Sequence, residues 1–242
     1  MTLNVNKCHV TRFSRRKKQE EPRYLVNDTP LVHKKCAKYL GIMFGNTLDW
    51  GEHVNSVVGR AMKNLHFVMR NLKGTSSQVK EKAYTTLIRP ILEYGAGIWD
   101  PHKKGQIKSL EAVQRKAARR VSGKVKWRKW ENSEMVPESV TQMIEKLGWV
   151  SLQERRRVSR LCNLYRAMSG HEAWQSPADR LLKPTYYGRK DHKYKVRPRA
   201  ARTDVGLYSP LNRAIRDWNG LDHKVVNNLL GTKDFRNRLS IY

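Results

Sequence analysis

The hydrophobic period of the chain changes at Asp49, and this change restricts the fold more than any other feature of the sequence. From there to Gly74, apolar residues recur every three or four positions, which is the spacing of one face of an α-helix. The stripe consists of Val54, Val58, Ala61, Leu65, Val68 and Leu72. Asp49 and Glu52 have the spacing of a capping box, so we expect the helix to begin here.

Further helical segments follow. The pattern predicts a helix over 77–99 that Pro90 kinks, and another over 106–121 that Gly123 ends. Later helices are expected over 137–147, 151–170, 211–218 and 234–239.

The segment before Asp49 has a different pattern. Apolar residues alternate near Val5, and the run KYLG (38–41) belongs to a short apolar stretch that glycines interrupt. With NDTP (27–30) as a turn, this segment predicts a small β meander. The predicted fold is mainly α with a small antiparallel β element at the N-terminus (α+β). We expect three parts, over 1–48, 49–123 and 124–242.

The charge of the chain indicates its partner. Its 242 residues include 49 Lys and Arg against 21 Asp and Glu, a formal net charge of +28. Such an excess favours a polyanion, and the expected partner is nucleic acid. The 3 Cys form no CxxC pair, and no signal peptide or membrane span is apparent. We therefore expect an intracellular, nuclear protein that is not secreted and does not contact a membrane.

No catalytic residue is predicted. The nine aspartates are scattered singly, and the sequence contains no P-loop, GxSxG or HExxH motif. Cys8, His9, His33 and Cys36 are either zinc ligands or a buried cysteine with surface histidines. Neighbours on a strand point to opposite faces, which favours the second alternative. No metal site is predicted.

Basic side chains form two helical faces. The first consists of Lys108, Arg115, Lys116, Arg119 and Arg120, and the second includes Arg155, Arg156 and Arg160. Each face either keeps the chain in solution or binds phosphate oxygens, and we favour binding because the guanidinium fork fits phosphate. Tyr186, Tyr187 and Tyr194 either stack on unpaired bases or anchor an irregular segment.

Several collinear stretches resemble one protein family. They are LNVNKCHVTRFS (3–14), KYLGIMF (38–44), LDWGEHV (48–54), YTTLIRPILEYGAGIWDP (84–101), LEAVQRKAARRVSG (110–123), LGWVSLQERRRVSRL (147–161) and WNGL (218–221). Together they resemble the C-terminal part of the reverse transcriptase of jockey-like non-LTR (LINE-type) retrotransposons, over nearly the whole chain.

The resemblance implies roles for particular residues. Lys7 matches a palm lysine near the phosphates of the incoming nucleotide. Lys38, Tyr39 and Gly41 match the primer grip. The helical unit over 49–123 matches the thumb, and the remainder matches a basic C-terminal region. The implied partners are an RNA–DNA hybrid, or RNA or DNA backbone.

The sequence departs from the family at the catalytic centre. Neither the aromatic-Ala-Asp-Asp motif nor the earlier palm aspartate is present. One hypothesis is a polymerase fragment that binds nucleic acid but is inactive, with the absent palm and fingers as partners. Mg²⁺ is expected only for the full-length polymerase, and this chain is expected to need no cofactor. The alternative is an independent, non-catalytic nucleic-acid-binding protein derived from such an element.

Overall fold

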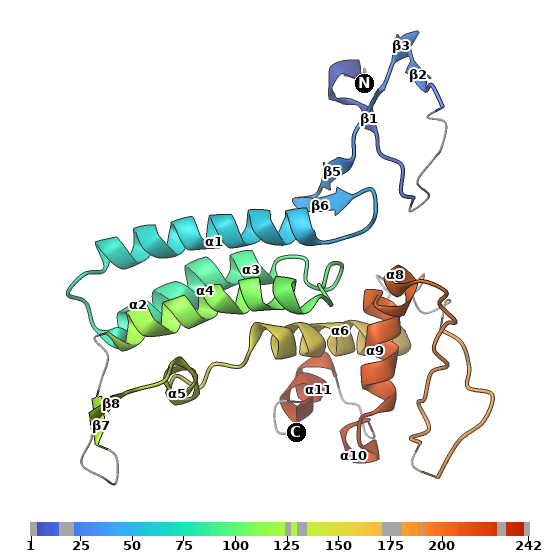
Figure 1. The fold of residues 1–242 in the computed structure, drawn as a ribbon. Helices are drawn as coiled ribbons and strands as arrows, with labels where there is room; N and C mark the ends of the chain where they lie inside the picture. The colour runs from blue at the N-terminus through green and yellow to red at the C-terminus, as the bar shows by residue number, and fades with distance from the viewer. Residues whose placement is uncertain are drawn as a thin grey trace.

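The computed structural model describes residues 4–14, 22–123, 127–129, 135–170, 181–189, 191–226 and 231–239. Leu3, the first residue of the quoted LNVNKC motif, lies outside these ranges. The described chain is mainly helical, with small two-stranded sheets that include three antiparallel pairs (Figure 1). The predicted α+β fold class is confirmed. Among the described residues, no helix combines the length and the apolar character needed to cross a membrane.

The N-terminal strands do not form one continuous meander. The 3₁₀ turn η1 (Val5–Lys7) precedes β1 (His9–Val10), which pairs in parallel with β4 (Val32–His33). Between them, β2 (Leu25–Val26) and β3 (Thr29–Pro30) form a separate hairpin. Its two loop residues both have positive φ, as tight hairpin turns require. The predicted turn is confirmed, and the predicted meander is wrong because its strands pair separately.

A second hairpin connects this region to the helices. β5 (Cys36–Tyr39) pairs with β6 (Ile42–Gly45) around the loop Leu40–Gly41, where φ is +45° and +83°. The hydroxyl of Tyr94 donates a hydrogen bond to the Leu40 carbonyl at 3.0 Å. Ile42 is 3% exposed and enters the helical core. The hairpin is therefore packed on the helical unit.

Helix α1 (Gly51–Asn71) begins differently from the capping-box prediction. Its N-cap is Trp50, and the Asp49 carboxylate accepts the Gly51 N–H at 2.7 Å. The same carboxylate binds Lys103 and accepts a hydrogen bond from Gln106 at 2.9 Å. Asp49 therefore holds the start of α1 beside the start of α4 (Lys104–Ser122).

The predicted kink near Pro90 is present as a π-helical turn. Helix α2 (Ser77–Ala83) continues into η2 (Tyr84–Ile88) and α3 (Arg89–Glu93). The Arg89 N–H donates to the Tyr84 carbonyl, five residues back. The helix ends at Glu93 rather than at 99, because the chain turns at Gly95, whose φ is +68°. Trp99 then lies in the core.

After α4 the chain forms a short antiparallel pair, β7 (Trp127–Lys129) with β8 (Met135–Pro137). The helix predicted to begin at Pro137 instead begins after Ser139, which forms a capping box with Gln142 and starts α5 (Val140–Lys146). The first hydrophobic core extends from Ile42 to Leu152, beyond the predicted boundary at 123.

Helix α6 (Leu152–Met168) contributes to both hydrophobic cores. Its later part packs with α9 (Pro210–Asn219) and α11 (Thr232–Leu239), while α8 (Asp204–Leu207) and α10 (His223–Val226) complete the C-terminal region. Trp218 and Phe235 are fully buried in this second core. The three-part division of the chain stays a prediction.

Candidate nucleic-acid interface

A basic cleft lies between α1 and α4. It is a cavity of about 520 Å³ lined by Lys63, His66, Met69, Arg70, Lys73 and Arg120. Met69 is buried and the cationic side chains around it are exposed. Among the described residues, none that lines the cavity is acidic. We call these residues, together with the neighbouring Lys116, the basic cleft.

The cations of the basic cleft lie close enough to interact electrostatically. Desolvation, followed by the charges of Lys116, Arg120 and Arg70, lowers the pKa of His66 from its ordinary value. Within the described ranges, the ion pairs of the structure include none of these cations. Neutral His66 and the unneutralised cations around it form a surface suited to phosphate oxygens.

Helix α4 presents a second row of cations on its solvent face. Lys108, Arg115 and Arg119 are exposed, while Leu110, Val113 and Ala117 on the opposite side are buried. Arg115 acts on the carboxylate of Glu111, whose pKa is raised by burial and lowered in part by that guanidinium. We call Lys108, Arg115 and Arg119 the outer row. Their role in binding stays a prediction.

The structure separates Arg155, Arg156 and Arg160 from the other predicted binding residues. Arg155 forms a two-point ion pair with Glu93, one contact of which is 3.0 Å. Arg156 is 3% exposed, donates to the Leu92 carbonyl and lies 4.6 Å from the Trp99 ring. The prediction that Arg156 belongs to a solvent-facing basic surface is wrong, because the core covers it.

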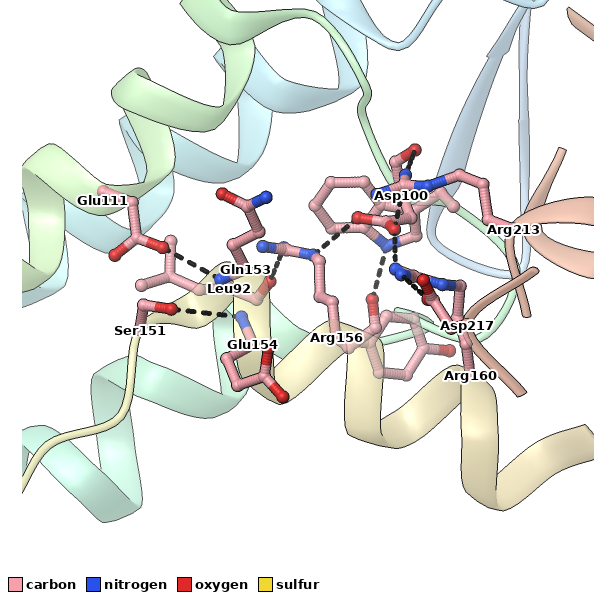
Figure 2. A network of polar contacts seen from close by, with 12 residues as sticks. Leu92, Asp100, Glu111, Ser151, Gln153, Glu154, Arg156, Arg160, Arg213 and Asp217 are labelled. Carbon is pink, nitrogen blue, oxygen red and sulfur yellow. Dashed lines mark hydrogen bonds and ion pairs between the residues drawn. The ribbon is translucent and has the colours of Figure 1, made fainter. Parts of the chain in front are cut away.

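Arg160 is also buried, within an ionic cluster. It pairs with Asp100 and, at 2.8 Å, with Asp217, while Arg213 contacts Asp100 at 2.6 Å (Figure 2). Burial raises the pKa of Asp100, and the positive charges of Arg160, Arg213 and Arg156 oppose this. The predicted exposed position of Arg160 is also wrong, because the fold buries it with acidic partners from distant parts of the chain.

The hairpin residues lie apart from the basic cleft. Lys38 and Tyr39 are exposed, and an added Cβ at Gly41 would lie 3.2 Å from Tyr94. The hairpin is beside the beginning of α1 (Figure 1), whereas the cleft is formed by the later half of that helix. Lys7 is exposed in the N-terminal region. The structure therefore brings α1 and α4 cations together but not the hairpin cations.

The three tyrosines of the irregular segment have different environments. Tyr194 is half-buried against the second core, and its carbonyl accepts a hydrogen bond from the Trp218 indole at 2.8 Å. Tyr186 and Tyr187 are 72% and 58% exposed. Tyr194 therefore anchors the irregular segment to the second core. For Tyr186 and Tyr187, stacking on unpaired bases and anchoring both stay open.

Sequence reasoning missed the α1 half of the basic cleft. Lys63, His66 and Arg70 have the spacing i, i+3, i+7, which places them on one helical face. No Asp or Glu lies between Glu52 and Glu81 in the sequence. This long acid-free segment, combined with the helical spacing, would have identified the face.

The described residues contain no group of three or more His, Cys, Asp or Glu side chains able to hold a metal ion. His33 Nε2 lies 3.0 Å from the Pro22 carbonyl, and the Cys8 thiol donates to the Asn4 carbonyl. The described residues therefore do not fit the Mg²⁺ ions of a polymerase centre. No catalytic step is derived from them.

The chain is similar to curated proteins of mobile genetic elements. A probable RNA-directed DNA polymerase from transposon X-element of Drosophila melanogaster is 25% identical over 124 residues, which make up 50% of this chain and 14% of that protein. The RNA-directed DNA polymerase from mobile element jockey of the same fly is 23% identical over 124 residues, 50% of this chain and 13% of its own length.

A probable RNA-directed DNA polymerase from transposon BS, also of Drosophila melanogaster, is 27% identical over 89 residues, 36% of this chain and 10% of its own length. No family model and no solved structure matches the chain. The resemblance to non-LTR retrotransposon RNA-directed DNA polymerases is confirmed over about half of the chain, and its predicted extent over nearly the whole chain stays a prediction. The match spans about a seventh or less of each relative.

Proposed function

We propose that this chain is a polymerase-related segment that binds the sugar–phosphate backbone of nucleic acid in the basic cleft. The observation that carries the proposal is the cavity between α1 and α4, whose described lining includes cations and no carboxylate. The net charge of +28 supports it by attracting polyanions at long range. The similarity to RNA-directed DNA polymerases supports nucleic acid rather than another polyanion. Nuclear localisation follows as part of this proposal.

The basic cleft and the outer row offer a matched comparison. The double variant Arg70→Gln/Arg120→Gln removes two guanidinium groups from the cleft. The slope of log affinity against log salt is expected to become shallower by about two units, because about two phosphate contacts are lost. Sequence preference should not change, because backbone contacts carry no base information. Fluorescence anisotropy with an RNA–DNA hybrid over a salt series measures both quantities.

The control is Arg115→Gln/Arg119→Gln, which removes the same charge from the outer row. Its effect on the slope should be smaller, because Arg115 and Arg119 are not among the residues that line the cavity, and Glu111 lies close enough to Arg115 to interact with its charge. If the two double variants change the slope equally, binding is due to diffuse charge. If only the outer-row variant changes it, the interface predicted from sequence is correct and the cleft proposal fails.

We also propose that this 242-residue chain does not polymerise DNA by itself. The proposal rests on the scattered aspartates and on the lack of a three-member ligand group among the described residues. Primer extension with purified chain, an RNA or DNA template, and Mg²⁺ or Mn²⁺ should show no template-dependent incorporation. Incorporation that copurifies with the chain through several separation steps would contradict this.

A further inference from the structure

A second cavity lies at the beginning of α4, apart from the basic cleft, which includes Arg120 near the end of that helix. Its volume is about 410 Å³, within the range of small-molecule sites. The beginnings of α4 and α6 line it together with α9. The residues that line it share no member with the basic cleft.

One wall of this cavity is a stacked aromatic pair. The rings of His102 and Tyr208 are 4.2 Å apart between centroids and 4° from parallel. The Arg216 guanidinium lies over the Tyr208 ring at 5.7 Å from its centroid. Desolvation, followed by the charges of Arg213 and Lys103, lowers the pKa of His102, which favours the neutral form of this ring. A neutral, flat, partly exposed aromatic surface suits another planar ring.

The remaining wall is rich in arginine. Arg157, Arg160, Arg213 and Arg216 line the cavity, against the carboxylates of Glu154 and Asp217. Although Arg160 is 4% exposed and bound to Asp100, its Nε is buried without a hydrogen-bond partner. The Arg216 guanidinium donates a hydrogen bond to the Leu207 carbonyl at 2.9 Å. Each guanidinium carries five donors, so this wall keeps donors for an anion.

We propose that this cavity binds one nucleotide unit, with its base against the His102–Tyr208 pair and its phosphate on Arg157, Arg213 and Arg216. A simple anion would not need the aromatic wall, and an uncharged ring would leave the arginine wall unused. The nucleotide unit comes either as a free mononucleotide or as an unpaired nucleotide of a single strand. Both present the same ring and phosphate.

Isothermal titration of the full chain with AMP, adenosine and inorganic phosphate tests the proposal. AMP should bind more tightly than either of the other two probes, because only AMP uses both walls. Tyr208→Leu should weaken AMP binding by about ten-fold, at the lower end of base–aromatic stacking. Tyr208→Phe should retain AMP binding, because it keeps the ring. Tyr208 is 36% exposed, so both variants are expected to fold, and thermal unfolding checks this.

A second variant separates this site from the basic cleft. Arg216→Gln should weaken both AMP and phosphate, whereas Arg70→Gln/Arg120→Gln should leave AMP binding unchanged. A single-stranded tetranucleotide distinguishes the two sources. If the tetranucleotide binds more tightly than AMP, and Tyr208→Leu weakens both ligands equally, the site binds an unpaired nucleotide of a strand. If the tetranucleotide binds no more tightly than AMP, the site binds free nucleotides. No AMP binding, or AMP binding that Tyr208→Leu does not change, overturns the proposal.

Discussion

Replacing Asp100 by asparagine should lower the free energy of unfolding by roughly 3–5 kcal/mol. The carboxylate is 3% exposed and pairs with Arg160 and Arg213, with Arg156 at 3.8 Å. Asparagine has nearly the same shape but no charge, so Arg213 and the buried Arg156 lose the carboxylate that they share, and the buried Arg160 keeps only Asp217. Urea unfolding followed by tryptophan fluorescence measures the change, and the melting temperature should fall by roughly 10 °C.

The control for Asp100 is Glu154→Gln. Glu154 pairs with Arg157 at 2.8 Å, but both side chains are over a third exposed. An exposed pair of this kind contributes about 0–1 kcal/mol to stability. The free energy of unfolding of this variant should therefore remain close to that of the parent protein. If Asp100→Asn cost no more than Glu154→Gln, the ionic cluster would not be holding the two cores together.

Acidification should destabilise the protein through His53. This residue is 2% exposed, and its ring lies edge-on to Trp99, 4.4 Å away between centroids. Its Nδ1 accepts the Met43 N–H at 3.2 Å. Burial, followed by the charges of Arg60 and Arg156, lowers its pKa to about 4. The folded protein therefore keeps this imidazole neutral.

The pH window follows from the two pKa values of His53. Between the ordinary value of 6.5 and about 4, the unfolded chain binds a proton that the folded chain does not. Stability is therefore fully present above pH 6.5 and is lost as the pH falls toward 4. At about 1.4 kcal/mol per pKa unit, the loss is roughly 3 kcal/mol.

His53→Gln isolates this contribution, because glutamine does not titrate. The difference in unfolding free energy between the parent and His53→Gln should shrink as the pH falls from 7 to 4. His66→Gln is the matched control: His66 is exposed, so it should preserve most of the parent's pH dependence. Parallel stability curves for the parent and His53→Gln would contradict the role of His53.

Local patterns in the sequence were sufficient to predict the longer helices, but not all of their ends and not the short helices α8 and α10. The apolar stripe from Val54 predicted α1, and Gly123 was correctly predicted to end α4. Pro90 correctly predicted an irregular helix. The pairing of β1 with β4 could not be predicted from local patterns, because the two strands are more than twenty residues apart in the sequence.

Arg156 and Arg160 show what helical periodicity cannot predict, namely whether a helical face is buried in the fold. Spacing along α6 places Arg156 and Arg160 on one face, and this was correct, since the two lie together. Spacing does not show what covers that face. Asp100 and Asp217 lie about sixty residues before and after Arg160 in the sequence and meet it only in the fold. An arginine-rich helical face therefore predicts a solvent-exposed surface even where the fold buries it.

The π-helical turn at Tyr84–Ile88 gives the chain one point that should tolerate a one-residue deletion. Such a turn contains one residue more than the regular helix would place there. Deleting a single codon within the turn should restore a regular helix and keep α3 in register with α2, so that Leu92 stays in the core and its carbonyl stays beside Arg156. A one-residue deletion within α2 removes no extra residue of this kind, and it should rotate the preceding part of α2 by about 100° relative to α3.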